Sequence, residues 1–208
     1  MKKILTSIIT LILVVAFALP EVSAKDSQVF EDVPATHPNF NDINYLVEQG
    51  VLEKESVYRP TDLITREEAI VMIAKAIGLD GTLRETKFED VPKSNVNSGY
   101  IQSAAEAGII YGVNVSTLKP NSNLTRLQMS LMLVRAFKLP LEEKVPEGTK
   151  LFKDVSWSWP DSNIVQSVAN SGITTGYSDG TFKPYNSLTR GHMAAFLTRA
   201  MKYVENNS

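Results

Sequence analysis

Three arginines follow a threonine at matching points of the 208-residue sequence, in the segments LITRE, NLTRL and SLTRG. Threonine is favoured at the N-cap of a helix, so each arginine is expected in a first helical turn. A cation is mildly unfavourable there, because the helix start already carries partial positive charge. The five N–H donors of a guanidinium, beside unpaired backbone N–H groups, suit a carboxylate. The sequence therefore predicts anion binding at Arg66, Arg126 and Arg190.

Each arginine could instead form a structural ion pair. The candidate partners are the aspartates of a recurring Phe-x-Asp-Val motif, Asp32, Asp90 and Asp154. For these aspartates we expect local turn formation, because a carboxylate beside a turn accepts hydrogen bonds from neighbouring backbone N–H groups. A single arginine would favour the ion pair, whereas three arginines at equivalent positions favour anion binding.

The arginines belong to a unit that occurs three times. Its Phe-x-Asp-Val motif begins at Phe30, Phe88 and Phe152, with spacings of 58 and 64 residues. After each motif, apolar residues at i, i+3, i+4 spacing predict a helix, and the glycine that follows predicts a left-handed helix end. A turn-rich connector ending in proline then leads to a second helix, which opens with the Thr-Arg pair.

The second helices carry an apolar stripe in every copy, which predicts core packing rather than a cofactor site. Glu68 and Gln128 complete capping boxes with Thr65 and Thr125, whereas His192 occupies that place in the third copy, so its cap is expected to be the weakest. Two helices cannot bury an apolar face alone. We therefore expect an all-α fold in which three helix-loop-helix repeats pack as a pseudo-threefold bundle, a pseudo-trimer.

The expected organisation is a signal peptide at 1–24, followed by repeats at 25–87, 88–151 and 152–208, the last with a short C-terminal tail. The first segment has two lysines, an apolar run of 16 residues up to Pro20, and small residues before a cleavage point after Ala24. A retained membrane anchor is the alternative, but the run is short for a span of about 20 residues. We expect secretion, with no membrane contact after cleavage.

The composition argues against several classes of function. The chain is 43% hydrophobic, lacks cysteine and has a net charge of -2, and removal of 1–24 leaves 19 basic and 22 acidic residues. An acidic balance disfavours nucleic acid as a partner, and the lack of cysteine excludes thiolate metal sites and cysteine nucleophiles. Two histidines are present, but no hydrolase or phosphate-loop motif.

Two carboxylates could hydrolyse a glycan in principle, but only linkers and a five-residue tail lie outside the leader and the repeats. We expect no catalytic residue, no metal and no cofactor.

The third copy carries GITTGYSDGTFKP before its Thr-Arg pair, and all three copies carry Phe-x-Asp-Val and Thr-Arg. In these motifs residues 30–203 resemble the S-layer homology family. The resemblance implies an all-helical pseudo-trimer that binds secondary cell-wall polysaccharide without a covalent bond, notably polymers ending in pyruvylated N-acetylmannosamine. In such proteins the anionic ketal lies in grooves between neighbouring repeats, and the arginine of the Thr-Arg motif is a principal contact.

The family also uses residues of a tryptophan-bearing segment and of the glycine-rich loop. The ligand-binding residues that the resemblance implies are Arg66, Arg126, Arg190, Trp157, Trp159, Gly112, Gly176, Tyr177 and Asp179. An indole face can stack on a sugar ring, but inter-repeat packing is an equally weighted alternative for both tryptophans. Asp179 lies in a turn sequence with too few further oxygen ligands for a calcium loop.

The copies depart from the family pattern in different ways. The first lacks the glycine-rich loop and has Pro38 where tryptophan is usual, and the second keeps Gly112 but loses the Asp-Gly pair and the tryptophan. Sites formed with the loop of the third copy are therefore expected to be the most complete. The resemblance implies a monomeric surface protein of a Gram-positive bacterium, with wall polysaccharide as partner and S-layer or other surface proteins as further partners. The alternative is a protein-interaction scaffold in which the arginines form structural ion pairs.

Overall fold

The computed structural model describes residues 29–207, so the predicted signal peptide lies outside the described residues. The described part contains six α-helices: α1 (Phe40–Glu48), α2 (Arg66–Ala76), α3 (Ser98–Glu106), α4 (Arg126–Ala136), α5 (Ser162–Asn170) and α6 (Arg190–Asn207). The predicted all-α class is confirmed. Among these helices, none combines the length and the apolar character that a membrane crossing requires.

The helix ends follow the predicted signals. Complete capping boxes occur at the starts of α2 and α4. In each box the side-chain oxygen of the N-cap threonine accepts a bond from the backbone N–H of Glu68 or Gln128, and the side chain of Glu68 or Gln128 accepts one from the backbone N–H of that threonine. At the start of α6, Thr189 Oγ1 accepts a bond of 3.2 Å from the backbone N–H of His192. Gly50, Gly108 and Gly172 follow α1, α3 and α5 with φ of 70°, 70° and 69°. These left-handed ends confirm the prediction, because glycine adopts that conformation without steric penalty.

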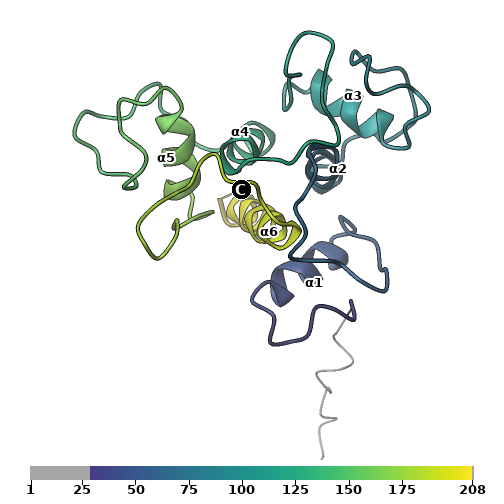
Figure 1. The fold of residues 1–208 in the computed structure, drawn as a ribbon, viewed down its shortest axis with the longest axis horizontal. Coiled ribbons are helices and arrows are strands. Elements are labelled where there is room, and N and C mark those ends of the chain that lie inside the picture. Colours follow the sequence, from purple (N-terminus) through teal and green to yellow (C-terminus); the bar gives the residue numbers. More distant parts are fainter. Residues whose placement is uncertain (1–28, 208) are drawn as a thin grey trace, which may run out of the picture.

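Helices α2, α4 and α6 lie together at the centre of the fold, and α1, α3 and α5 lie around them (Figure 1). Each outer helix packs on a central helix of another repeat: α3 on α2, α5 on α4, and α1 on α6. Among the described helices, no outer helix packs on the central helix of its own repeat. The helix pairs are thus formed across repeat boundaries, and the α1–α6 pair joins the first repeat to the last.

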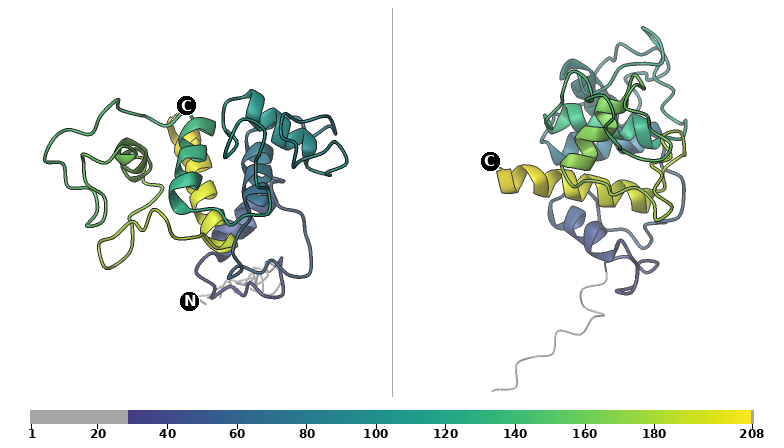
Figure 2. Two further views of the ribbon diagram at one scale, coloured as in Figure 1. Left: turned by 45° about the horizontal axis from the view of Figure 1, so that its top comes forward. Right: turned by 90° about the vertical axis from the view of Figure 1, so that its left-hand side faces the viewer.

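The three connectors meet at the starts of the central helices, which run side by side in Figure 2. The backbone N–H of Ile64 donates to the carbonyl of Leu188 at 3.0 Å, Leu188 donates to Leu124 at 2.9 Å, and Leu124 donates to Ile64 at 3.1 Å. All three residues have no exposed surface. This closed ring of hydrogen bonds holds the N-termini of α2, α4 and α6 close together.

The aspartates of the Phe-x-Asp-Val motif hold these connectors. The two carboxylate oxygens of Asp154 accept backbone hydrogen bonds from Phe182 and Lys183, each at 2.7 Å, and join segments 28 and 29 residues apart. Asp32 and Asp90 make the equivalent pairs of bonds. Lys183 has a φ of 57°, which is uncommon for a residue with a side chain. The expectation of a purely local turn is therefore wrong, since the carboxylates act across the repeat.

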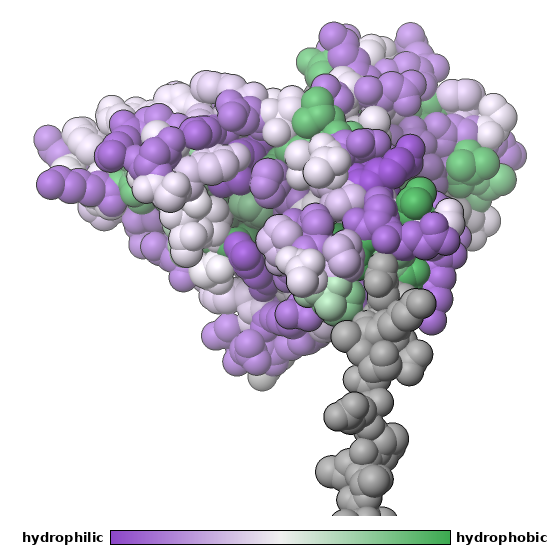
Figure 3. Space-filling model, turned by 60° about the horizontal axis from the view of Figure 1, so that its bottom comes forward, coloured by the Kyte–Doolittle hydropathy of each residue, from purple (hydrophilic) through white to green (hydrophobic). Residues whose placement is uncertain are grey.

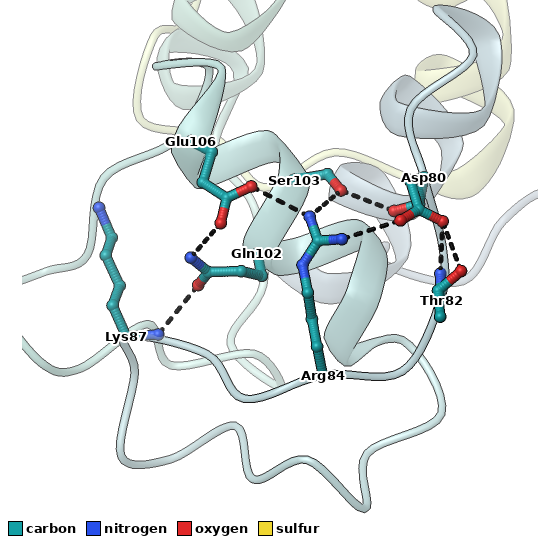
Figure 4. A network of polar contacts seen from close by, with 7 residues as sticks. All are labelled: Asp80, Thr82, Arg84, Lys87, Gln102, Ser103 and Glu106. Carbon is teal, nitrogen blue, oxygen red and sulfur yellow. Dashed lines mark hydrogen bonds and ion pairs between the residues drawn. The ribbon is translucent and has the colours of Figure 1, made fainter.

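The linker between the first two repeats is fastened to α3 by Arg84 (Figure 4). Its guanidinium donates to Asp80 at 2.9 Å, to Ser103 at 2.7 Å and to Glu106 at 3.0 Å. Ser103 Oγ donates to the carbonyl of Asp80 at 2.6 Å. Because Asp80 closely follows α2, this network holds α3 against α2 and so positions the loop after α3.

The apolar stripes of the central helices form the core, as predicted. The stripe residues that are at most 1% exposed are Ala69, Ile73, Met129, Leu133, Met193, Leu197 and Ala200. On the face shown in Figure 3, hydrophobic residues form small separate patches between polar ones. The stripes therefore supply the contacts among the three central helices.

We expect Asp154→Asn to lower the free energy of unfolding by about 1.5 to 3 kcal/mol, because one of two charge-assisted hydrogen bonds to the connector is lost. Asp161→Asn is the matched control, since Asp161 is exposed and stands at the N-cap of α5 without a side-chain capping bond. Urea unfolding followed by circular dichroism measures both variants. Equal losses of stability would contradict the role of Asp154.

Candidate anion-binding sites

Each first-turn arginine reaches from its central helix to a loop of another repeat. Arg66 Nη2 donates to the carbonyl of Tyr111, in the loop after α3, at 2.6 Å. Arg126 Nε donates to the carbonyl of Phe182 at 2.7 Å. Arg190 Nε donates to the carbonyl of Tyr58 at 2.8 Å. The three arginines therefore stand at three junctions between repeats.

The backbone N–H groups beside these arginines already have partners. The N–H groups of Arg66 and Glu67 donate to the carbonyls of Ser122 and Pro120, at 2.8 and 2.9 Å. The same two bonds occur at the starts of α4 and α6. The connector of a neighbouring repeat covers each helix start, so the prediction that these backbone donors help to bind an anion is wrong. Only the arginine side chains remain to do so.

The aspartates considered as ion-pair partners do not contact the arginines, because both oxygens of each carboxylate bind a connector. Arg190 pairs instead with Glu68 of α2. Among the described residues, Arg66 and Arg126 form no ion pair. The three arginines therefore differ in their charged surroundings.

Arg66 lines a cavity of about 310 Å³ with Tyr111, Gly112, Gln128 and Arg135, which we name the Arg66 pocket. Arg66 is 8% exposed, and its buried Nε makes no hydrogen bond within the described structure. Burial lowers the pKa of Arg66 below its ordinary value, yet an arginine stays protonated in proteins. A buried charge without a counter-charge is unfavourable, so the pocket presents a cation that an incoming anion would stabilise.

Arg126 is enclosed by aromatic rings at the second junction, the Arg126 site. Its guanidinium carbon lies 4.8 Å from the ring centroids of both Tyr177 and Phe182. Arg126 Nη2 is 3.4 Å from Thr174 Oγ1, which accepts a bond of 3.1 Å from the backbone N–H of Gly176. The structure thus brings together three of the predicted ligand-binding residues, Arg126, Gly176 and Tyr177.

Two basic side chains of α6 belong to the same site. Arg199 Nη1 donates to the carbonyl of Ile173 at 3.1 Å, directly before Thr174. Desolvation of the His192 ring lowers its pKa, and the charge of Arg126 lowers this pKa further. No carboxylate forms an ion pair with either arginine of the site among the described residues.

Arg190 lines a cavity of about 230 Å³ with Glu53, Glu55, Glu68 and Lys75, the Arg190 pocket. Arg190 Nη1 pairs with Glu68 Oε1, and Lys75 Nζ lies 3.0 Å from Glu53 Oε1. Both cations of this pocket therefore have carboxylate partners from the chain itself.

Sequence reasoning missed the second basic residue of each site, which is Lys75, Arg135 or Arg199. Each follows the first-turn arginine of its own helix by nine residues. Because nine residues make about two and a half turns, the two side chains point to opposite sides of the helix. Each central helix therefore contributes to two neighbouring sites. The recurring spacing of nine residues between the two basic residues was the sequence signal that could have predicted this arrangement.

The two loop glycines are required by packing. A Cβ atom on Gly176, which has a φ of +75°, would lie 2.5 Å from the ring of Phe152. On Gly112 it would lie 2.2 Å from the carbonyl oxygen of Asn114 and 3.0 Å from the ring of Phe88. Both glycines allow their loop to fold closely over the phenylalanine of the Phe-x-Asp-Val motif.

Asp179 is engaged within its own loop. Its Oδ1 accepts bonds from the backbone N–H of Thr181 at 3.0 Å and from Thr181 Oγ1 at 2.6 Å, while Oδ2 lies 3.1 Å from Lys183 Nζ. The bonds from Thr181, followed by that from Lys183, lower the pKa of Asp179 to about 2. Within residues 29–207, no group of three or more histidine and carboxylate side chains is arranged to hold a metal ion.

Trp157 and Trp159 line a separate cavity of about 380 Å³, with Lys144 and Asn163 among its walls and none of the three first-turn arginines. The indole of Trp159 packs edge-on against Tyr185, with ring centroids 5.8 Å apart. Trp157 is 37% exposed. The structure therefore separates the predicted tryptophans from the predicted arginines.

Comparison with known proteins points to one family. A family model described as S-layer homology domain matches residues 29–70, 87–130 and 151–194. The chain is 33% identical over 199 residues to "Endoglucanase" from Bacillus sp. (strain KSM-635), covering 94% of this chain and 21% of that protein. It is 32% identical over 203 residues to "S-layer protein" from Bacillus licheniformis, with coverage of 94% and 22%. It is 29% identical over 207 residues to "S-layer protein sap" from Bacillus anthracis, with coverage of 97% and 24%. The chain thus spans about a fifth to a quarter of the length of these relatives.

We expect the pKa of His192 to lie below 6.5 and to rise in Arg126→Gln, although not fully, because desolvation of the ring remains. A folded-state pKa below the unfolded one means that the folded chain binds fewer protons. The stability linked to neutral His192 is therefore present above about pH 6.5 and declines as the pH falls through that region. NMR titration of the imidazole C–H signals measures the pKa, with His192→Gln identifying the signal. An unchanged pKa in Arg126→Gln would contradict the influence of Arg126.

Proposed function

Because the chain belongs to the S-layer homology domain family, we propose that it is retained at the bacterial cell surface by non-covalent binding to secondary cell-wall polysaccharide. The expected ligand is a polymer that carries ketal-linked pyruvate on N-acetylmannosamine. In this proposal the arginines bind the carboxylate of the ketal-linked pyruvate. In this proposal the chain is secreted, binds the wall and catalyses no reaction.

The Arg66 pocket is the observation that carries the proposal. Two guanidinium groups, those of Arg66 and Arg135, line it without any carboxylate. The unpaired Nε of Arg66 is a donor without an acceptor in a buried position, and charge-assisted hydrogen bonds to carboxylates are among the strongest that proteins make. The guanidinium carbon of Arg135 lies 4.7 Å from the ring centroid of Tyr111, so a cation–π contact holds the second guanidinium beside the cavity.

The Arg126 site supports the same chemistry. Arg126 and Arg199 supply positive charge without an internal ion pair. Burial lowers the pKa of Arg126, and the nearby charge of Asp154 partly offsets this lowering. Tyr177 covers one face of the Arg126 guanidinium. Two sites on one chain, engaged by repeating units of one polymer, would raise the retention well above that of a single site.

The exposed face of Trp157 is proposed to bind a sugar unit that lies outside the arginine sites. The cavity beside it, at about 380 Å³, is lined by polar groups as well as by both indoles. This mixture is typical of sites that stack an aromatic ring on the apolar face of a sugar and hydrogen-bond its hydroxyl groups.

A second candidate function is a scaffold for protein interactions in which the arginines are structural. The ion pair between Arg190 and Glu68 favours this alternative at one of the three junctions. A scaffold would bind its partner whether or not the wall polymer carries ketal pyruvate, which separates the two candidates by experiment.

We expect the protein to sediment with Bacillus wall sacculi that carry pyruvylated secondary polymer, and not with sacculi stripped of that polymer or of its ketal pyruvate. Arg66→Ala should weaken binding at its site by roughly ten- to a hundredfold, since a hydrogen bond to a charged group contributes about 1.5 to 3 kcal/mol. Lys93→Ala is the control, because Lys93 is an exposed cation that lines neither the Arg66 pocket nor the Arg190 pocket.

Two results would count against the proposal. Equal sedimentation with native and pyruvate-free sacculi would favour the scaffold. Equal losses in Arg66→Ala and Lys93→Ala would mean that general surface charge, and not the Arg66 pocket, binds the wall. Circular dichroism of each variant checks that the helices remain folded.

A further inference from the structure

The residue directly before the Phe-x-Asp-Val motif differs in character among the three repeats. It is Val29 in the first, Lys87 in the second and Leu151 in the third. Val29 and Leu151 are partly buried and pack against the hydrophobic core, whereas Lys87 is exposed. The second repeat thus has a cation at a position where the other two repeats bury an apolar side chain, and it gives up the stability that such burial contributes.

This lysine lies beside the Arg66 pocket. Lys87 Nζ is 5.6 Å from the ring centroid of Tyr111, which lines that pocket. The guanidinium carbon of Arg135 lies 4.7 Å from the centroid of the same ring, and the carbonyl of Tyr111 accepts the bond from Arg66. Three cations, from the linker, α4 and α2, are therefore gathered around one tyrosine that is 56% exposed.

The three cations have no counter-charge within the described part of the chain. None of them forms an ion pair there, and no acidic residue is among those that line the Arg66 pocket. The buried Arg66, which is 8% exposed, has an Nε without an acceptor. Like charges held close together repel one another. A ligand with more than one negative charge would relieve this repulsion and supply the missing acceptor.

The backbone at Lys87 is fixed by the network that fastens the linker to α3. Its N–H donates to Gln102 Oε1 at 3.0 Å, and Gln102 Nε2 donates to Glu106 Oε1 at 2.8 Å. The other oxygen of Glu106 accepts the bond from Arg84. In Figure 4 the side chain of Lys87 extends from this network, and its ammonium group makes no bond to the residues drawn. The lysine is therefore anchored through its backbone while its charge remains available to a ligand.

Lysines beside the other two junctions are neutralised by the chain itself. Lys75, which lines the Arg190 pocket, lies 3.0 Å from a carboxylate oxygen of Glu53. At the Arg126 site, Lys183 Nζ is 4.3 Å from the ring centroid of Tyr177, but it also lies 3.1 Å from a carboxylate oxygen of Asp179. Their counterpart beside the Arg66 pocket has no such partner among the described residues.

We propose that the Arg66 pocket and Lys87 together bind a glycan that carries two neighbouring anionic groups. This inference rests on the proposed function and specifies the ligand of one site. Arg66 and Arg135 bind the ketal carboxylate, and Lys87, beside the ring of Tyr111, binds the second anionic group. A carboxylate or a phosphodiester next to the sugar that bears the ketal has this chemistry.

The test compares three probes by isothermal titration calorimetry. The first is the methyl glycoside of ketal-pyruvylated N-acetylmannosamine, which has one negative charge. The second is the same sugar with a methyl phosphodiester at its anomeric position, and the third is the same sugar linked to a hexuronic acid. The second and third probes therefore carry the additional anionic group as a phosphodiester or as a carboxylate, and they distinguish these two sources.

We expect at least one two-anion probe to bind the native chain about fivefold more tightly than the one-anion probe at low salt, as one exposed ion pair would contribute. This gain should disappear in Lys87→Gln and in Arg66→Ala and persist in Lys87→Arg. It should also disappear at about 1 M salt, where the Debye length is about 3 Å. Lys54→Gln is the matched control, since Lys54 is an exposed lysine that lines neither the Arg66 pocket nor the Arg190 pocket. Thermal unfolding of every variant checks that the fold is retained.

Equal affinities of the native chain for all three probes would overturn this inference and leave the proposed function intact. A gain that persists in folded Lys87→Gln, or that Lys54→Gln removes to the same extent, would overturn it as well. Failure of the native chain to bind any of the three probes would instead overturn the proposed function, and this inference with it.

Discussion

The arrangement of the arginine sites depends on three backbone hydrogen bonds that close into a ring. Ile64, Leu124 and Leu188 each donate to the next connector, and each stands two residues before a first-turn arginine. The ring gathers the three helix starts, and the neighbouring connectors then take up the backbone N–H groups of the first turn. The helix starts can therefore offer an external anion little beyond side-chain donors, and the arginines extend outward to the junctions.

Pairing of helices across repeat boundaries has a second consequence for these sites. Because α3 packs on α2 and α5 on α4, a site takes its arginine from one repeat and its loop from the next. Helix α4 contributes Arg126 to one site and Gln128 with Arg135 to another. A single repeat holds no complete site, and the Arg190 pocket depends on the α1–α6 contact that joins the first repeat to the last.

Local features of this fold were predictable from sequence, and the partners of each element were not. The N-cap threonines, the left-handed glycines and the apolar stripes depend on a few neighbouring residues, and they occur where predicted. An apolar stripe indicates that a helix face is buried but not which helix buries it, so the pairing across repeats was missed. The aspartates were assigned to local turns for the same reason, since their partners lie 26 to 29 residues away. Trp157 and Trp159 were grouped with the arginines by resemblance, and the structure places them at another cavity.

The third position of each central helix shows how one side chain can serve both its own helix and a neighbouring junction. A capping box contributes about 1 kcal/mol to a helix, and Glu68 and Gln128 both complete one. Glu68 uses one carboxylate oxygen for the cap of α2 and the other for Arg190, so the start of α2 is tied to α6. Gln128 caps α4 and lines the Arg66 pocket. With His192 at this position, Thr189 keeps only one of the two bonds of the box, because an imidazole has no carbonyl or carboxylate oxygen to accept the second.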